Sequence, residues 1–316
     1  MITTDVDFIR DCLTRGDIVG FPTETVYGLA ANIFDEKAIA RIFATKNRPS
    51  SNPLIVHVPS IDHAKELVTY FPPKAEQLAK HFWPGSLTLI LPKRAHVLDT
   101  VTAGQSSVAI RIPNHPMATQ LLEKLAFPLA APSANPYNRI SPTSAQQVDF
   151  YFPNIHTLDG GECAAGLEST ILSFDNDEVV LLRHGAVSVN DIENQVGRIL
   201  NRTSHTALPI SPGRSQKHYS PLCDLIVTYE PLFMLSAVQE KKVGILWFDK
   251  VTIQSQKVLV HRVLAPSGSL QEAARNLFKC LHQMEQMGLD LLIVERLPDI
   301  GLGRTINDRL ERASVK

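Results

Sequence analysis

Isolated cations in apolar or neutral surroundings are the first residues of this chain that could do chemistry. In the segment SSVAIRIPNHP, residues 106–116, strand alternation places Val108, Ile110 and Ile112 on one face and Ser107 and Arg111 on the other. A charged side chain in the middle of an apolar strand is costly to bury without a partner. Arg111 must therefore reach water, an acidic side chain or an anionic ligand, and this segment alone favours neither the ion pair nor the ligand.

A second group of polar residues lies in KNRPSSNPLIVHV, residues 46–58. Lys46 and Arg48 come at the end of an expected helix, where the helix dipole alone could explain two cations. The loop also offers neutral hydrogen-bonding groups such as Asn52, and a guanidinium fork beside an ammonium suits a polyphosphate. His57 follows in an apolar strand, where a lone histidine is more often structural.

Three segments are rich in small hydroxyl residues: PTETVYGLA (22–30), APSANPYNRISPTS (131–144) and GLESTIL (166–172). Small side chains let backbone N–H groups approach a phosphate or carboxylate closely. Helix capping explains PTETVYGLA about as well as ligand binding does. For each of the other two segments, plain turn chemistry is the better explanation when the segment is taken alone. Arg183, at the end of an apolar strand, adds another isolated cation.

The common nucleotide and hydrolase motifs are absent from the sequence. It contains no Gly-Lys pair, hence no Walker A loop, and no G-x-G-x-x-G, H-E-x-x-H or G-x-S-x-G. If the chain uses ATP, it must hold the phosphates by other means.

Strands alternating with helices are expected to position these residues. Residues 53–58, 87–91, 107–112, 169–174 and 179–183 read as strands, and Asp35 is placed to cap a helix that buries Ile39 and Ile42. A helix near 189–200 would begin at Ser188 and carry one apolar side, made of Ile192, Val196, Ile199 and Leu200.

Residues 201–222 interrupt this pattern with proline, serine, glycine and basic residues. Beyond them we expect strands at 224–229, 243–248, 257–263 and 289–294, and helices near 231–240 and 269–287, the latter closed by Gly288. This alternation indicates a small parallel α/β domain. We therefore predict a catalytic domain at 1–200, a linker or lid at 201–222 and a C-terminal domain at 223–316.

Composition limits the classes of function. The chain has 316 residues, 44% hydrophobic and 20% charged, and a formal net charge of −1, which is unlike a protein whose whole surface binds nucleic acid. Its four cysteines, at 12, 163, 223 and 280, form no CxxC pair and read as free thiols of a reducing compartment. No apolar run is long enough to span a membrane and the first residues lack a signal-peptide core, so we expect a cytoplasmic protein.

Taken together, the segments resemble the YrdC-like family of L-threonylcarbamoyladenylate synthases, in the long form with an added C-terminal domain. The blocks that carry the resemblance are PTETVYGLA, KNRPSSNPLIVHV, PGSLTLIL, VAIRIPNHP, APSANP, SPTS, GLESTIL and LLRHGAV, with KHYSP and GLGRTINDRLERAS in the tail. Asn47 stands where the family more often has glycine.

The resemblance implies an α/β fold. An open, twisted YrdC-like α/β core with a basic concave site would be followed by a smaller Rossmann-like C-terminal domain. The implied reaction converts L-threonine, bicarbonate or CO2, and ATP into threonylcarbamoyl-AMP and pyrophosphate. A downstream threonylcarbamoyl-transferase system would pass the group to tRNA. Mg2+ would arrive with the ATP, and a weak contact with tRNA is compatible with this role.

The resemblance also assigns roles by position. Lys46 and Arg48 would be catalytic. The L-threonine pocket would comprise Thr25, His57, Arg111, Ala131 and Ser169, with Arg111 on the substrate carboxylate. ATP would contact Arg48, Asn52, Ser107, Ser133, Ser141, Arg183 and Tyr219.

Two other classes of protein are open at this point. A non-catalytic RNA-binding module would also use a basic concavity, although the net charge of −1 and the lack of basic strands rich in aromatic residues argue against it. A carbamoyl-transfer maturation factor would share the core, but such proteins are longer and carry zinc-binding CxxC pairs that this chain lacks.

Overall fold

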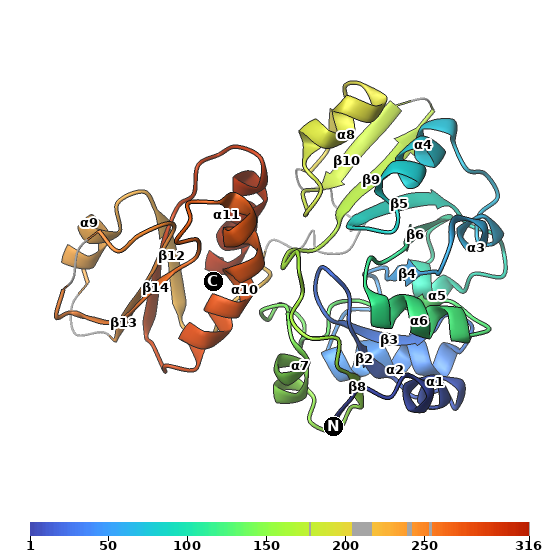
Figure 1. The fold of residues 1–316 in the computed structure, drawn as a ribbon, viewed down its shortest axis with the longest axis horizontal. Coiled ribbons are helices and arrows are strands. Elements are labelled where there is room, and N and C mark those ends of the chain that lie inside the picture. Colours follow the sequence, from blue (N-terminus) through green and yellow to red (C-terminus); the bar gives the residue numbers. More distant parts are fainter. Residues whose placement is uncertain (177, 204–216, 239–241, 253–254, 316) are drawn as a thin grey trace.

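A computed structural model describes residues 1–176, 178–203, 217–238, 242–252 and 255–315. The described residues form two sheets, each with its own helices (Figure 1). The first sheet is built from the N-terminal part of the chain and the second from residues after 223. The α/β fold class is confirmed, and the second domain is a parallel sheet as expected.

In the described residues the first sheet has eleven strands in the order β1-β8-β2-β3-β7-β4-β6-β5-β9-β10-β11. Parallel and antiparallel pairs alternate irregularly across it. Its strands are β1 (Ile2–Thr3), β2 (Val19–Phe21), β3 (Gly28–Asn32), β4 (Ile55–His57), β5 (Leu87–Pro92), β6 (Ser107–Arg111), β7 (Leu129–Ala130), β8 (Thr157–Leu158), β9 (Thr170–Asp175), β10 (Glu178–Arg183) and β11 (Leu200–Asn201). The helices around it are α1 (Val6–Thr14), α2 (Glu36–Lys46), α3 (Ile61–Glu66), α4 (Pro73–Phe82), α5 (Asp99–Thr102), α6 (Pro116–Lys124), α7 (Ala145–Tyr151) and α8 (Val189–Val196).

The second sheet has the order β12-β15-β13-β14 among the described residues, with every pair parallel. Its strands are β12 (Asp224–Thr228), β13 (Val243–Trp247), β14 (Val258–Val263) and β15 (Leu291–Glu295). Its helices are α9 (Pro231–Ser236), α10 (Leu270–Glu285) and α11 (Leu302–Ser314). Figure 1 shows α10 and α11 on the side of this sheet that faces the first one.

Local sequence signals explain where several elements begin and end. Asp35 caps α2 by accepting a hydrogen bond from the Ala38 amide at 3.0 Å, as predicted. Asn47 closes the same helix in the left-handed region at φ 52°, a conformation that glycine adopts most easily and asparagine tolerates. The preference of the family for glycine at this position therefore has a backbone cause.

The predicted helix at 189–200 is corrected at its end. The structure confirms the Ser188 cap but ends α8 at Val196, because Gly197 has φ 78°. Ile199 and Leu200 therefore lie outside the helix, and Leu200 begins the edge strand β11. The helix α11 was not predicted, because the GLGRTINDRLERAS segment is mostly polar and shows only a narrow apolar stripe.

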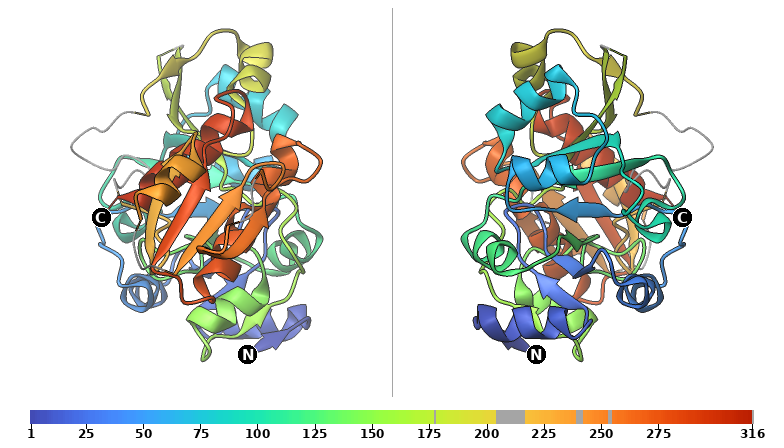
Figure 2. Two further views of the ribbon diagram at one scale, coloured as in Figure 1. Left: turned by 90° about the vertical axis from the view of Figure 1, so that its left-hand side faces the viewer. Right: turned by 90° about the vertical axis from the view of Figure 1, so that its right-hand side faces the viewer.

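The two parts of the chain share a hydrophobic core. Val26, Ile140 and Leu167 of the first part pack in one cluster with residues of α10 and α11 such as Leu277 and Ile306. In the left view of Figure 2 the second sheet and its helices lie in front of the first part of the chain. We call this cluster the interdomain core.

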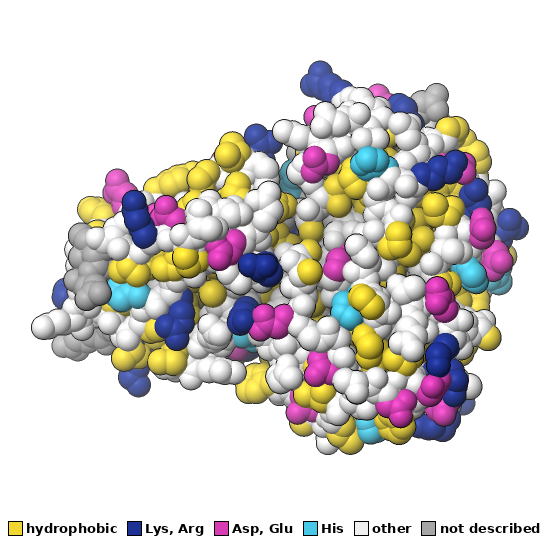
Figure 3. All heavy atoms as spheres, viewed as in Figure 1, with side chains coloured by type: hydrophobic (Ala, Val, Ile, Leu, Met, Phe, Trp, Pro, Cys, Tyr) yellow, Lys and Arg dark blue, Asp and Glu magenta, His cyan; other side chains and the backbone are white. Residues whose placement is uncertain are grey.

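No helix in the described ranges is both long and apolar enough to cross a bilayer. On the face shown in Figure 3, lysine and arginine side chains are interspersed with aspartate and glutamate.

Candidate active site

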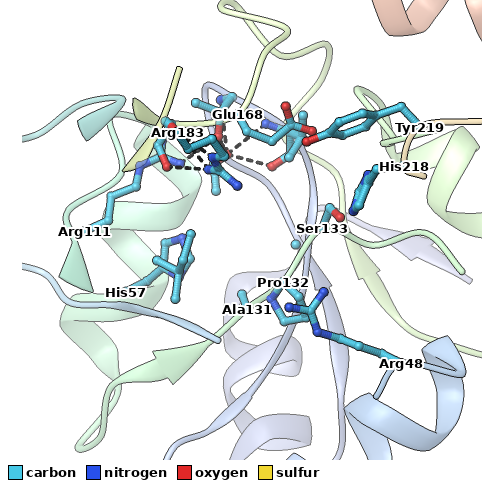
Figure 4. Close-up of a pocket in the computed structure, with 16 residues that line it drawn as sticks. Arg48, His57, Arg111, Ala131, Pro132, Ser133, Glu168, Arg183, His218 and Tyr219 are labelled. Carbon is cyan, nitrogen blue, oxygen red and sulfur yellow. Dashed lines mark hydrogen bonds between the residues drawn. The ribbon is translucent and has the colours of Figure 1, made fainter. Parts of the chain in front are cut away.

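An open cavity lies where β4, β6 and the hydroxyl-rich loops meet. Figure 4 shows that side chains from well-separated segments point into it. Its lining comprises Thr23, Thr25, Val26, Gly28, Arg48, Ile55, His57, Arg111, Ala131, Pro132, Ser133, Glu168, Ser169, Arg183, His218 and Tyr219. Nine of the thirteen residues predicted for the site are in this lining; Lys46, Asn52, Ser107 and Ser141 are not.

Arg111 belongs to this lining, and three contacts hold its guanidinium. It donates from Nε to the Gly85 carbonyl at 3.0 Å and from Nη1 to Thr25 Oγ1 at 2.7 Å. Its Nη2 forms an ion pair with the Glu24 carboxylate. The structural ion pair that the sequence left open therefore exists, and it fixes the direction in which Arg111 faces the cavity.

Glu24 is the functional side chain that sequence reasoning passed over at this end. Its carboxylate also accepts hydrogen bonds from Ser86 Oγ at 2.8 Å and from the Asn114 amide at 3.1 Å. A buried carboxylate with that many donors is held in one orientation. The only sequence signal was an acidic residue between two threonines in PTETVYGLA.

His57 lies beside Arg111 because β4 and β6 are parallel and place the two residues in register. Burial, reinforced by the charge of Arg111, lowers the pKa of His57 to about 3, so its imidazole is neutral at pH 7. Its Nδ1 is buried without a hydrogen-bond partner and is available to a ligand. Ala131 continues the same wall, its amide bonded to the Ile55 carbonyl at 2.9 Å.

Arg183 and Ser169 form a second polar cluster in the lining. Arg183 donates from Nε and Nη2 to the Ser169 carbonyl at 3.1 and 2.8 Å, and from Nη2 to the Ser169 hydroxyl at 3.1 Å. Ser169 Oγ is also 2.7 Å from Thr88 Oγ1. Burial lowers the pKa of Arg183 to about 10, which leaves it charged at pH 7.

Arg48 enters the cavity from the loop that follows α2. Its Nη2 donates to the Pro53 carbonyl at 3.1 Å, while Nε is buried without a partner. Burial lowers the pKa of Arg48 to about 10, so this guanidinium is also charged at pH 7. With Arg111 and Arg183 it makes three guanidinium groups around one cavity, which suits an anionic ligand.

Lys46 is placed differently from its predicted role. It is 1% exposed, and its ammonium donates to the carbonyls of Ser133 and Asn135. Burial, reinforced by Arg48, lowers the pKa of Lys46 well below its ordinary value. In this structure Lys46 holds the loop that carries Ser133 and lies behind the cavity wall.

The other three predicted ATP residues also lie outside the lining. Asn52 contacts the Tyr137 hydroxyl at 3.4 Å. Ser141 donates to Glu168 Oε1 at 2.8 Å and is completely buried. Ser107 lies at the start of β6, four residues before Arg111.

Tyr219 and His218 bring the end of the linker into the site. Tyr219 is 1% exposed, has φ 64° and stacks on Phe278 of α10 with ring centroids 5.4 Å apart. Its hydroxyl is buried without a partner, and burial raises its pKa to about 12. Burial, reinforced by Arg48, holds the pKa of His218 well below 6.5. Residues 204–216 of the predicted lid lie outside the described residues.

Among the described residues of the lining, no hydroxyl is hydrogen-bonded to a histidine or carboxylate side chain. The guanidinium groups and hydroxyls that are present suit alignment and charge neutralisation. The carboxylates near the cavity, Glu24 and Glu168, are both ion-paired with arginines. No cluster of three histidine, cysteine or acidic side chains in the described ranges could hold a metal ion.

Comparison with known proteins identifies the family. The family model described as "Telomere recombination" matches residues 11–185, and the model "Threonylcarbamoyl-AMP synthase, C-terminal domain" matches residues 187–315. The threonylcarbamoyl-AMP synthase of Pyrococcus abyssi is 40% identical over 97% of this chain and 92% of its own length. The chain belongs to the threonylcarbamoyl-AMP synthase family.

Members of the family from other organisms match over the same extent. The Bacillus subtilis threonylcarbamoyl-AMP synthase is 38% identical, covering 96% of this chain and 90% of its own length. The crystal structure of the P. abyssi family member complexed with L-threonine superposes with a TM-score of 0.89 at 37% identity. That likeness covers 98% of this chain and 94% of the other. The resemblance stated from the sequence is confirmed, and the match over both domains does not fit the maturation-factor alternative.

Proposed function

We propose that this protein is a threonylcarbamoyl-AMP synthase that joins L-threonine, bicarbonate or CO2, and ATP, and releases pyrophosphate. The observation that carries the proposal is a cavity lined by three guanidinium groups and small hydroxyls, in a chain that matches family members over both domains. The product would be the activated donor for threonylcarbamoylation of tRNA by a downstream transferase system.

The reaction fits a site without a protein nucleophile. The neutral amine of threonine attacks the carbon of CO2 and loses one proton to solvent, which gives a carbamate. A carbamate oxygen then attacks the α-phosphorus of ATP, and pyrophosphate leaves with the bond's electron pair. The protein has to align two reactants and neutralise phosphate charge, which is the work that arginines and backbone dipoles do best.

The threonine half of the cavity is assigned to the Arg111 end. Arg111 would pair with the substrate carboxylate, while Thr25, His57, Ala131 and Ser169 orient the amine and hydroxyl. In favour of this assignment, β4 and β6 place His57 and Arg111 side by side, and Glu24 fixes the guanidinium. The P. abyssi family member was crystallised as a complex with L-threonine, which is the ligand expected here.

The nucleotide half is assigned to Arg48, Ser133, Arg183 and Tyr219. Arg48 would neutralise charge during transfer, and its partnerless Nε is available for a phosphate oxygen. Lys46 would act through the Ser133 loop, and Ser141 through Glu168, since both lie behind the wall. Asn52 and Ser107 would reach ATP only at the rim. Mg2+ would be carried by the phosphates.

Organisation and location follow from this function. We assign residues 1–200 to the catalytic domain, 201–222 to a linker that closes over the nucleotide, and 223–316 to the Rossmann-like domain. An enzyme that supplies tRNA modification would work in the cytoplasm, with at most a weak contact to tRNA itself.

Pyrophosphate release tests the proposal. Purified protein should release pyrophosphate only when L-threonine, bicarbonate and Mg-ATP are all present, and omission of any one should reduce release to background. Equal release without threonine would remove the assigned function. No release from any mixture, together with tight tRNA binding, would favour the RNA-binding module.

A further inference from the structure

Arg309, in the last helix of the chain, lies against the wall of the cavity. It belongs to α11 of the second domain, yet it is 1% exposed and its contacts reach across to the first domain. Its Nε donates to Glu168 Oε2 at 2.9 Å, and its Nη2 donates to the His184 carbonyl at 2.7 Å. In sequence, Glu168 precedes Ser169 of the threonine half, and His184 follows Arg183 of the nucleotide half.

Glu168 connects Arg309 to the lining. Glu168 borders the cavity, and both of its oxygens are occupied: Oε2 by Arg309 and Oε1 by the Ser141 hydroxyl at 2.8 Å. A buried carboxylate beside a phosphate site would repel the ligand unless its charge were balanced. Arg309 supplies that balance and keeps Glu168 from competing for the cations that face the cavity.

Tyr219 depends on Arg309 from a second direction. The guanidinium carbon lies 5.2 Å from the centre of the Tyr219 ring, within cation–π range, and Phe278 of α10 stacks on the same ring. Tyr219 also has φ 64°, which costs energy for a residue other than glycine unless its surroundings hold it. Two side chains of the C-terminal domain therefore keep this residue in the cavity wall. Figure 4 shows Tyr219 and Glu168 on the same side of the cavity.

We propose that Arg309 is a positioning residue for the nucleotide half of the site, so that the C-terminal domain completes the ATP pocket through Glu168 and Tyr219. The proposal rests on the proposed use of ATP. The simpler reading is that Arg309 only joins the two domains. The two explanations differ in whether loss of Arg309 weakens ATP binding more than threonine binding.

Thr305 offers a matched control on the same helix. It lies one turn before Arg309, is 3% exposed, and donates across the same interface to the Gly185 carbonyl at 3.1 Å. No hydrogen bond of its side chain to Glu168 or Tyr219 is present among the described contacts. Thr305→Val keeps the shape and removes the interdomain hydrogen bond, so it measures loosening of the interface alone.

The experiment measures ATP and L-threonine binding by calorimetry and pyrophosphate release, using the full chain with Arg309→Met, Arg309→Lys or Thr305→Val. Arg309→Met should weaken ATP binding by roughly 10-fold or more, as loss of a supporting residue typically does, with threonine binding changed much less. Arg309→Lys should lie between wild type and Arg309→Met, because one ammonium can pair with Glu168 but cannot also hold His184 and cover Tyr219. Thr305→Val should lower the melting temperature and leave ATP binding as in the wild type.

Several results would overturn the proposal. One is a folded Arg309→Met protein that binds ATP like the wild type, and another is Thr305→Val weakening ATP binding as much as Arg309→Met. If Arg309→Met does not fold, unchanged ATP binding by folded Arg309→Lys overturns it as well. A wild-type protein that binds ATP but releases no pyrophosphate would remove the proposed reaction only, whereas one that binds no ATP would remove both.

Discussion

His57 and Arg111 are register partners on the neighbouring parallel strands β4 and β6, so an uncharged imidazole and a guanidinium lie side by side in the cavity wall. Their strands pair in one sheet, and Glu24 and Thr25 bind the guanidinium. The pair is therefore fixed before any ligand arrives. A carboxylate bound by Arg111 would have an imidazole Nδ1 available beside it.

Arg111→Ala should act mainly on threonine. We expect the KM for threonine to rise far more than the KM for ATP, because the guanidinium lies beside His57 in the cavity wall. Arg183→Ala is the matched comparison, and it should raise the KM for ATP more than the KM for threonine. Steady-state kinetics with each substrate varied in turn would measure both, after thermal unfolding has shown that the variants fold. Collapse of ATP affinity in Arg111→Ala with unchanged threonine affinity would reverse the assignment.

Arg48→Ala should lower kcat/KM by about 10²-fold or more, as removal of other charge-stabilising groups does. The expected cause is loss of a cation that neutralises the phosphates during transfer. Arg48→Lys keeps the charge without the fork and should recover part of the loss. Pyrophosphate release under single-turnover conditions would measure the effect, and an unchanged rate would place Arg48 outside the chemistry.

Lys46→Met should mainly lower the free energy of unfolding, because Lys46 contacts the Ser133 loop and lies behind the cavity wall. Two carbonyls, those of Ser133 and Asn135, would lose their donor, at about 1–3 kcal/mol each. Chemical denaturation would measure the free energy of unfolding, with Lys37→Met on the exposed side of the same helix as a control. A Lys46→Met protein as stable as the wild type, but inactive, would support the direct phosphate contact instead.

Closure of the linker should protect it from protease. Lys217 is exposed in this structure, while the next two residues, His218 and Tyr219, are buried in the cavity wall. Tryptic cleavage after Lys217 should be fast in the free protein and slow with ATP and threonine; Arg214, the other expected cleavage site, lies outside the described residues. Tyr219→Ala should abolish the protection, and Tyr219→Phe should keep most of it. Equal cleavage with and without ATP and threonine, together with an active Tyr219→Ala enzyme, would show that the segment only connects the two domains.

Stability should fall as the pH drops below about 6.5. Burial lowers the pKa of His57 to about 3 and of His282 to about 4, and it holds that of His218 well below 6.5. The unfolded chain takes up these protons first, so the stabilisation is complete above pH 6.5 and is lost as the pH falls toward the folded pKa values. Three such groups give a slope of up to about 4 kcal/mol per pH unit.

His282→Gln tests this dependence away from the site. Its imidazole Nε2 lies 3.3 Å from the Ser141 carbonyl, and glutamine can donate to the same oxygen. Between pH 6 and 4.5 the variant should lose up to about 1.4 kcal/mol per pH unit of this slope, the contribution of one such group, when the free energy of unfolding is measured by denaturant titration. An unchanged slope would show that His282 titrates normally in the folded protein.

The sequence predicts strands and local caps well because their causes are local. Alternation along residues 107–111 placed Arg111 correctly, and Asp35 sits where a cap is needed. The partners of these residues were not predictable, because Glu24 is 87 residues from Arg111 and Glu168 is 141 residues from Arg309. The role of Lys46 could not be predicted from the sequence: its type and position suit a phosphate, but only the fold reveals that its ammonium donates hydrogen bonds to two carbonyls.

The interdomain core also constrains how the second domain could be lost or exchanged in evolution. Val26, Ile140 and Leu167 belong to the first part of the chain but are covered by side chains of α10 and α11. A single-domain descendant would place these three apolar side chains in water, next to its own substrate cavity. Loss of the second domain in evolution would therefore need compensating polar substitutions at these positions, and exchange of the second domain between distant relatives would need both faces to change together.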